Sequence, residues 1–565
     1  MKMRSLRFLL FTMTVGFLTA FGPEKDMIQS SNEPLPDISA TDRNPLELGG
    51  VAGTPPGGGA AAKRRGGYSS PRLQDNDTLS RGDYFSKKHY TDAPIPTFAE
   101  HRAELPVPVL DDAPEYVEMY WRAWELAFAH FKKPPHNSPF VSNYIDEAFA
   151  PQIFQWDTIF MIMFSRYAFP IFPTVQSLDN FYVRQHRSGY ICREIFEADG
   201  RDFYYEGVAN TVNPPLFAWA ELEAARLSGD TARLRLALPP LEKYAAWLET
   251  GRRSTKTVHR LYWQTNLGSG MDNMPRTGSG WVDMSAQVVI MDHAMAGICD
   301  VLGKQDAALA YRRHAEEIAG LMNRFMWNAE DGLYYDVDDQ GKQIRWKTVA
   351  CFWPMLAKIC SPEQAERLML HLKDPKSFWR TIPFASFAAD QPGYRPDGDY
   401  WLGSVWAPTN VALIKGLERN GYEEFATAAT EKYLDGLFRV YRKTGTFWEN
   451  YAPDNVARGS QSKPDFVGWT GCGPIQLLLE NVIGVRCDAL KKRIDWILKR
   501  RDRHGIERLR IGDATVSLLC APRATFASPA TITATTDRPL ELVVHHAAGL
   551  TTFSLTPGVQ TLRVP

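Results

Sequence analysis

The sequence has few cysteines, almost no net charge and no internal repeat. Its seven cysteines among 565 residues follow no metal-ligand spacing, and their odd number leaves at least one thiol unpaired or paired between chains. We therefore expect buried free cysteines. The formal net charge of −1 indicates neither a nucleic-acid partner nor a membrane-surface partner. The lack of a fixed-period repeat argues against an open solenoid.

The chain also lacks a long apolar run at its start. Lys2, Arg4 and Arg7 precede an apolar stretch, 8–21, that is too short to span a bilayer comfortably. This pattern predicts a signal peptide over 1–22 and an exported protein, periplasmic or secreted, with no stable membrane insertion after cleavage. A membrane anchor is the alternative, and no cysteine follows that would carry a lipid. Residues 23–83 have no hydrophobic period, which predicts a disordered linker.

Helical periodicity begins after residue 112 and continues to about 484. Asp112, Pro114 and Glu115 form a helix-start pattern, and Val117, Trp121, Trp124, Phe128 and Phe131 then repeat at helical spacing. Roughly twelve helices are predicted by the same criteria, near 112–132, 152–168, 174–186, 214–228, 231–250, 283–302, 305–327, 346–358, 362–373, 401–420, 422–443 and 470–483. Twelve helices with long loops after alternate ones predict six helical hairpins closed in a ring, with the loops collected at one end.

The pattern changes near the C-terminus. Alternating, β-branched stretches at 516–519, 531–535, 540–544, 551–555 and 560–564 predict a small antiparallel β module over 505–565. We expect it mainly to pack on the helical domain, which spans 84–504. The basic run 491–503 carries Ile494, Trp496, Ile497 and Leu498 at an apparent helical spacing, which favours a solvated helix there.

Two loops rich in glycine and aromatic residues each hold one acid. Asp272 lies in the stretch Gly-Ser-Gly-Met-Asp-Asn-Met-Pro-Arg over 268–276, and Glu449 lies in Gly-Thr-Phe-Trp-Glu-Asn-Tyr-Ala-Pro over 445–453. An aspartate in a glycine-rich loop is usually a turn residue. A pair of carboxylates on separate aromatic loops is what glycosidic bond cleavage requires, one protonated and one ionised.

Further pairs of aromatic and polar residues lie in predicted loops or at helix starts: Trp156, Asp157, Asn213, Asn273, Tyr400, Trp401, Trp406, Trp448 and Trp469. Together with the acid loops, these stretches resemble the six-hairpin, trehalase-like glycosidases, and most of all glycoside hydrolase family 63 with its mannosylglycerate-hydrolase-like relatives. The resemblance covers about 143–473. The glycine-rich signature of family 37 trehalases before the Trp-Asp pair is absent, which disfavours trehalose as substrate.

The resemblance implies a mainly α fold, an (α/α)6 barrel, and inverting hydrolysis of an α-linked sugar. It places the general acid on Asp272, the general base on Glu449, and sugar contacts on Trp156 and Asp157. The other residues of this group would line the pocket and bind substrate. No metal or cofactor is needed for this chemistry, and the partner is an oligosaccharide or glycoside.

Physical reasoning adds expectations about protonation and about the cleavage site. Met271, Met274 and nearby tryptophans would raise the pKa of Asp272, while Asn450 and Tyr451 would donate to an ionised Glu449. A maximum rate in mildly acidic to neutral conditions would follow. A blind pocket at one end of the ring predicts exo-action. The sequence does not decide whether the released sugar is glucose-like or mannose-like.

Two other classes of function remain open at this stage. A polysaccharide lyase would use residues such as His186, Arg187, Tyr190 and Arg193 on a uronic acid. A glycan-binding protein could keep the fold without the chemistry, although the presence of both acids argues against it. Fold analogy alone does not decide between them.

Overall fold

The computed structural model describes residues 67–68, 83–147, 149–205, 212–466 and 468–565, so the predicted signal over 1–22 lies outside it. Most of the predicted linker also lies outside, but Gly67–Tyr68 form strand β1, which pairs with β7 (Asp202–Tyr205). None of the described helices is long and apolar enough to cross a membrane. The seven cysteines form no disulfide with one another, as expected.

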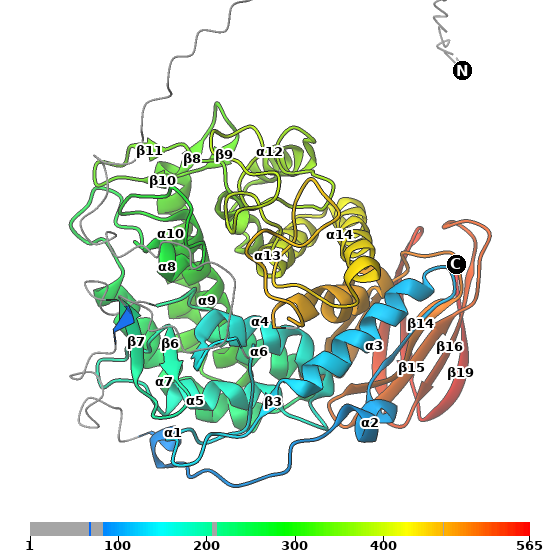
Figure 1. The fold of residues 1–565 in the computed structure, drawn as a ribbon. Helices are drawn as coiled ribbons and strands as arrows, with labels where there is room; N and C mark the ends of the chain where they lie inside the picture. The colour runs from blue at the N-terminus through cyan, green and yellow to red at the C-terminus, as the bar shows by residue number, and fades with distance from the viewer. Residues whose placement is uncertain (1–66, 69–82, 148, 206–211, 467) are drawn as a thin grey trace, which may run out of the picture. The chain divides into compact units, whose positions relative to one another are not determined.

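Each of the twelve predicted helical segments contains a helix, and these alternate between two layers (Figure 1). The inner helices are α4 (Gln155–Ser165), α6 (Phe217–Ser228), α9 (Val282–Val301), α11 (Trp353–Leu356, after η7, Val349–Phe352), α13 (Ala407–Arg419) and the π-helix η9 (Gly473–Ile483). Each packs on the next in this order, and η9 packs on α4, so the series returns to its start.

The outer helices alternate with the inner ones along the chain, beginning with α3 before α4. They are α3 (Pro114–Ala129), α5 (Asp179–Tyr182, after η6, Thr174–Leu178), α7 (Thr231–Gly251), α10 (Gln305–Phe325), α12 (Pro362–Lys373) and α14 (Glu423–Thr444). Burial differs between the long helices of the two layers: every residue of α4 and η9 is buried, whereas α10 buries only Ala308, Ala315, Ile318 and Met322. The short outer helix α5 is an exception, with all four residues buried. An all-round apolar helix needs neighbours on every side, which the inner position provides.

The start of α3 differs from the prediction. The helix begins at Pro114 with Ala113 as its N-cap and without a side-chain cap. The backbone N–H of Asp112 donates instead to Asp502 Oδ2, 3.1 Å away. Proline at the first position is the part of the predicted start signal that the structure keeps.

The C-terminal strands form two sheets that begin earlier than predicted. One has the order β19-β16-β15-β14-β2 and the other β12-β13-β17-β18. Their bounds are β2 (Val107–Leu110), β12 (Val485–Asp488), β13 (Arg493–Ile497), β14 (His504–Ile511), β15 (Ala514–Cys520), β16 (Ala530–Thr536), β17 (Leu540–His546), β18 (Gly549–Leu555) and β19 (Gly558–Val564). All pairs are antiparallel except β13 with β17, which is parallel.

The basic run near 491–503 is therefore a strand and not the predicted helix. Ile494 and Trp496 are fully buried, while Arg493, Asp495 and Ile497 are half-buried, which is the two-residue period of a strand. The Trp496 Nε1–H donates to the carbonyl of Ile483, 2.9 Å away, and so caps the end of η9. The apparent helical spacing came from Ile494, Ile497 and Leu498 alone.

The C-terminal sheets pack against two of the inner helices, η9 and α6. Strands β14 and β2 pack on η9, and β12 and β14 pack on α6, so the C-terminal sheets lie beside the helices (Figure 1). The proline of β2, Pro108, sits on an edge strand, where its missing N–H costs no ladder bond. Short strand pairs lie in the loops elsewhere: β3 (Phe131–Lys132) with β4 (Tyr144–Ile145), β8 (Trp327–Asn328) with β9 (Leu333–Tyr334), and β10 (Asp336–Val337) with β11 (Gln343–Ile344). Strands β5 (Gln152–Phe154) and β6 (Glu194–Phe196) belong to a four-stranded sheet of order β1-β7-β6-β5.

Candidate active site

The predicted tryptophans meet where the inner helices begin. Trp156 lies in the first turn of α4, Trp406 directly precedes α13, and Trp469 directly precedes the short turn η8 (Thr470–Cys472) that leads into η9. The ring of Trp469 is 5.7 Å from Trp156 and 5.6 Å from Trp406. Trp401 stacks flat on Trp406 at 4.1 Å and lies 6.1 Å from Trp156. The structure thus gathers four of the predicted aromatic residues, from three separate loops, into one cluster.

These rings do not all contribute accessible surface. Trp401 and Trp406 are 1% and 0% exposed, so they support the site from behind. Trp448 is half-buried, donates its Nε1–H to Thr444 Oγ1 at 3.0 Å, and lies under the guanidinium of Arg458 at 5.0 Å. Flat rings partly open to solvent are suited to packing against a sugar, and Trp448 fits that description better than Trp406.

The loop that carries Asp272 is folded tightly against Trp156. The one-turn helix α8 (Asn266–Ser269) is capped by Thr265, whose Oγ1 accepts from the N–H of Gly268 at 3.0 Å. Gly270 follows with a φ of +76°, and a Cβ there would lie 2.3 Å from the Trp156 ring. Only glycine tolerates both the left-handed backbone and this close approach. The glycine-rich sequence therefore brings Asp272 against the aromatic cluster.

Asn273 joins this loop to the one that carries Tyr400 and Trp401. Its Nδ2–H donates to the carbonyl of Asp399 and its Oδ1 accepts from the N–H of Trp401, both at 2.9 Å. Asp399 and Tyr400 adopt left-handed φ values of +32° and +64°. Such conformations are strained for residues with side chains and need support from their surroundings. The Asn273 amide provides it, so the predicted substrate-binding residue also positions Tyr400.

Arg276 anchors the far side of the Asp272 loop. Its guanidinium donates two bonds of 2.7 Å to Asp283 in the first turn of α9 and two bonds of 2.9 Å to Asp336 in β10. All three side chains are buried, and the ring of Trp281 lies 4.4 Å from the guanidinium carbon. Asp336, which the sequence left without a role, is therefore a structural partner of Arg276.

Glu449 is held by backbone groups. Its N–H donates to the carbonyl of Lys463 at 3.0 Å, and the N–H of Lys463 donates to Glu449 Oε2 at 3.2 Å. The Nε1–H of Trp469 donates to the Glu449 carbonyl at 2.9 Å. The expectation that Asn450 and Tyr451 would donate to Glu449 is wrong. The Tyr451 hydroxyl accepts from the N–H of Trp448, and the Asn450 side-chain amide has no hydrogen-bond partner among the described residues.

The charges of three carboxyl groups act on the hydroxyl of Tyr400. Burial raises the pKa of Tyr400 well above its usual value, and the charges of Asp272, Glu449 and Asp157 raise it further. Glu449 is 4% exposed, and burial raises its pKa to about 8, with a smaller contribution from the charge of Asp272. Burial also raises the pKa of Asp157, which the Arg193 guanidinium opposes. The structure therefore brings Asp272, Glu449 and Asp157 within electrostatic reach of one another.

Asn213 and Arg193 support this group from the side of α8. Asn213 Nδ2–H donates to the carbonyl of Gly268 at 3.2 Å, and its N–H donates to Gln155 Oε1 at 3.3 Å. Arg193 donates to the carbonyl of Leu267 and forms an ion pair with Glu194. Both predicted residues thus hold the Asp272 loop in place.

The other residues considered for lyase chemistry form a separate cluster. His186 Nε2 is 2.8 Å from Asp202 Oδ2, and the buried Tyr190 ring lies 5.3 Å from His186 and 5.1 Å from Trp247. Arg187 is exposed. Of the four candidates, Arg193 is the one whose charge acts on Asp157 and Tyr400.

Sequence reasoning missed two features of the site. Lys463 contributes only its backbone, a donor that any residue except proline could supply. Glu147 is buried, and both of its carboxyl oxygens are without a hydrogen-bond partner in the described part of the chain. Burial raises its pKa, with further contributions from Asp146 and Asp157. Its position before α4 gave no signal in the sequence.

Comparisons with known proteins agree with this geometry. The family model of the mannosylglycerate hydrolase MGH1-like glycoside hydrolase domain matches residues 150–470. An uncharacterised protein of Borreliella burgdorferi is 27% identical over 62% of this chain and 75% of its own length. A probable mannosyl-oligosaccharide glucosidase of Schizosaccharomyces pombe is 26% identical over 39% of this chain, but the match spans only 29% of that protein.

A solved structure shows the same fold. The family 63 mannosylglycerate hydrolase of Thermus thermophilus, in complex with Tris and D-glycerate, superposes with a TM-score of 0.52 at 19% identity. The match covers 62% of this chain and 98% of that enzyme. The family match spans more than half of the chain, including both acid loops and the aromatic cluster. The chain therefore belongs to the MGH1-like glycoside hydrolase family, and its helical domain is a glycoside hydrolase domain.

Proposed function

We propose that this protein is an exo-acting, inverting glycoside hydrolase that releases an α-linked sugar from an oligosaccharide or small glycoside. Its helical ring would be an (α/α)6 barrel, with the C-terminal strands forming a β-sandwich-like module beside it. The sugar would be glucose-like or mannose-like. The glucosidase and mannosylglycerate hydrolase relatives support this choice, although each of those names describes the relative alone.

One observation carries the proposal: Asp272, Glu449 and Asp157 lie on segments that contact Trp156 and Trp469 of the aromatic cluster, and the charges of all three act on Tyr400. Two carboxyls flanking a glycosidic bond can divide the acid and base roles, and a third can hold sugar hydroxyls. Burial raises the pKa of Glu449 and of Asp157, which poises buried carboxyls of this site to exchange protons near neutral pH.

The roles follow from what each acid touches. Asp272 would be the general acid, on a loop closed against Trp156, and Glu449 would be the base that activates water. The backbone N–H of Lys463 stabilises the ionised form of Glu449, which favours the base role. Asp157 would hold hydroxyl groups of the sugar, and the charge of Arg193 would favour its ionised form against the effect of burial. Trp156 and Trp448 would pack on the ring.

The test is a screen of the purified protein on α-linked disaccharides, glycosides and oligosaccharides, with the products followed by proton NMR. We expect one monosaccharide to be released per cleavage, with the β-anomer appearing first. A first-formed α-anomer would show retention and would contradict the inverting assignment. An unsaturated product absorbing in the ultraviolet would show elimination and would support the lyase alternative. Binding without turnover would leave only glycan recognition.

Export is part of the same proposal. The charged start and apolar stretch of residues 1–22 support cleavage of a signal peptide, after which the enzyme would act in the periplasm or outside the cell. N-terminal sequencing of the mature protein from the native host would give a start near residue 23. An intact Met1 on the active protein would contradict it.

A further inference from the structure

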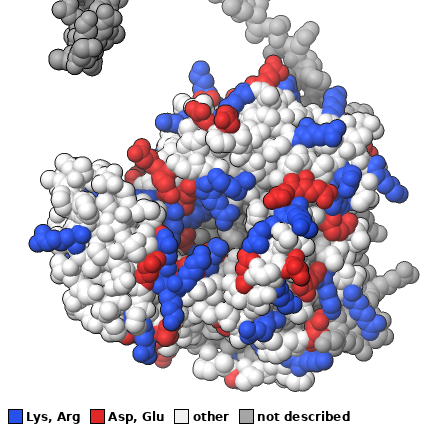
Figure 2. All heavy atoms as spheres, turned by 180° about the vertical axis from the view of Figure 1, so that it is seen from behind, with Lys and Arg blue, Asp and Glu red and all other residues white. Residues whose placement is uncertain are grey.

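A cavity of about 300 Å³ lies where the inner helices end. Arg166 follows the last residue of α4, Arg226 lies in the last turn of α6, and Arg419 is the last residue of α13. The candidate active site is built where the same helices begin. Viewed from behind, the molecule shows Lys, Arg, Asp and Glu side chains gathered around a hollow (Figure 2).

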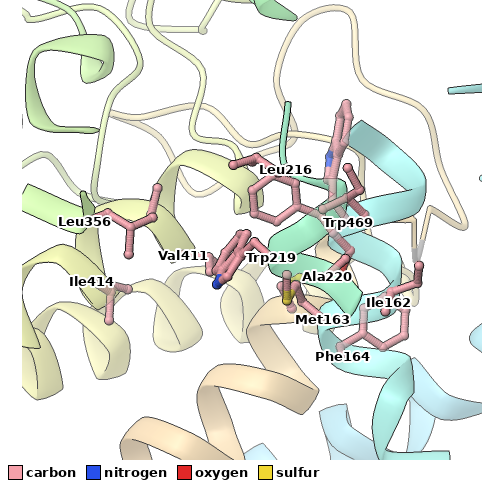
Figure 3. Packing of buried hydrophobic residues seen from close by; sticks show 14 of the residues in the cluster. Ile162, Met163, Phe164, Leu216, Trp219, Ala220, Leu356, Val411, Ile414 and Trp469 are labelled. Carbon is pink, nitrogen blue, oxygen red and sulfur yellow. Dashed lines mark hydrogen bonds between the residues drawn. The ribbon is translucent and has the colours of Figure 1, made fainter. Parts of the chain in front are cut away.

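Packed aromatic residues separate this cavity from the candidate active site. Trp156 contacts Phe160 at 5.9 Å, and Phe160 contacts Trp219 at 6.1 Å, so three rings run along the inside of the helical ring. Trp219 lines the cavity, and Leu216, Val411 and Trp469 belong to the same buried cluster (Figure 3). A molecule in the cavity would therefore not touch the carboxyls at the other end.

The acids in the cavity wall already have cationic partners. Glu480 accepts from Arg166 at 2.7 Å and lies 2.8 Å from Lys415. Glu223 accepts from Arg166 at 2.8 Å and from Arg226 at 2.5 Å. Their oxygens are occupied, so a metal ion or a cationic ligand would have to displace buried ion pairs.

The cationic groups, by contrast, have unused N–H donors. Arg419 is exposed to solvent, yet the protein atoms around it desolvate its guanidinium and lower its pKa. Its one hydrogen bond among the described residues runs from NH1 to the carbonyl of Leu356, at 2.7 Å. The Nε of Arg486 is buried and has no hydrogen-bond partner in the described chain. Trp219 also lines the cavity.

Two acceptors in the wall also lack partners. Gln476 Oε1 and Asp488 Oδ1 are buried and accept no hydrogen bond from any described residue. The wall holds five cationic and five acidic side chains, so its formal net charge is zero. Net charge therefore does not attract a ligand to the cavity. It would be recognised by matched groups: an oxyanion for the guanidinium donors and hydroxyl groups for the two acceptors.

We propose that this cavity binds a small hydroxylated oxyanion of monosaccharide size, either a sugar phosphate or a sugar acid. Its volume suits a small ligand, and bidentate guanidinium contacts suit both phosphate and carboxylate. Arg486 and Asp488 belong to β12, whereas Arg226 and Arg419 belong to the helical ring. A bound molecule would therefore join the ring to the C-terminal sheets and stabilise their packing.

The proposal is tested by calorimetric titration and thermal unfolding of the full mature chain with glucose 6-phosphate, gluconate, inorganic phosphate and glucose. We expect glucose 6-phosphate or gluconate to bind at least about tenfold more tightly than glucose and to raise the unfolding temperature. Comparing these two anions shows whether phosphate or carboxylate is preferred. Equal affinity for inorganic phosphate and glucose 6-phosphate would overturn the requirement for hydroxyl groups.

Variants locate the site. Arg419→Gln should weaken binding of the preferred anion about tenfold or more, because a hydrogen bond to a charged group is lost. Trp219→Phe keeps an aromatic ring, removes the indole N–H together with part of the ring surface, and should weaken binding less. Arg439→Gln, an exposed arginine on α14, is the matched control and should leave the affinity unchanged. Unchanged affinity in Arg419→Gln, with its fold confirmed by circular dichroism, would overturn the proposal.

Discussion

The two ends of the helical ring hold their charged groups in different ways. Where the inner helices begin, Asp157 and Glu449 are buried, and neither forms an ion pair with another described residue. Where the same helices end, Arg166 lies between Glu223 and Glu480, both within 2.8 Å. Pairing keeps the pKa of Glu480 low, near 2, while the pKa of Glu449 is raised to about 8.

This difference distinguishes a reactive end from a structural one. A buried carboxyl without a cation is costly, and it persists where chemistry needs a tunable proton. A buried ion pair mostly fixes geometry, because each charge satisfies the other. The following predictions test whether the two ends differ in this way.

The largest effect is expected from the acid pair. Asp272→Asn and Glu449→Gln should each lower kcat on a natural substrate by about a thousandfold or more, since each removes proton transfer in the transition state. Asp513→Asn and Glu330→Gln, acids that are each 84% exposed, should keep wild-type rates. Near-normal hydrolysis by either site variant would remove that residue from the mechanism.

A substitution where the inner helices end should lower the free energy of unfolding and leave kcat unchanged. Arg166→Leu leaves Glu223 and Glu480 with one partner fewer, and we expect a loss of about 3–5 kcal/mol in the free energy of unfolding. Arg345→Leu, whose surface partners Glu330 and Asp331 lie 3.3 Å away, should cost about 1 kcal/mol or less. Urea unfolding measures both. A large fall in kcat of folded Arg166→Leu would show that this end takes part in the chemistry.

The pH dependence of kcat/KM shows whether Glu449 acts as the general base or as the general acid. As the base it must be ionised, and its pKa of about 8 in the empty site means that it is mostly protonated below that pH. The value of kcat/KM should then rise about tenfold per pH unit up to about pH 8, a higher pH than the mildly acidic to neutral maximum expected from the sequence. A fall in kcat/KM above pH 8, with no rise below it, would make Glu449 the acid.

The sequence predicted the helices and the reactive loops better than the contacts within them. A helix lies in each of the twelve segments predicted from apolar spacing and helix-end signals. Those signals are local in the sequence, so they can be read without knowing the tertiary neighbours. The strand at 493–497 was missed because two-residue burial depends on β17, a distant neighbour. The donor to Glu449 is a backbone N–H, which carries no residue signature. The orphaned carboxyl of Glu147 is likewise set only by tertiary burial.

The smallest effect is expected from Asn273, which acts on the site through Tyr400. Asn273→Ala removes both bonds to 399–401 and leaves two left-handed residues without support. Each bond is worth about 0.5–1.5 kcal/mol, so the unfolding free energy should fall by about 1–3 kcal/mol. We expect kcat to fall about tenfold, because Tyr400 is no longer held in position. Asn273→Asp keeps the acceptor for the Trp401 N–H but loses the donor, and should fall between Asn273→Ala and the wild type. If Asn273 contacted only the sugar, both variants would raise KM and leave kcat unchanged. A change in kcat that follows the number of retained loop bonds would show that Asn273 positions Tyr400 among the three carboxyls.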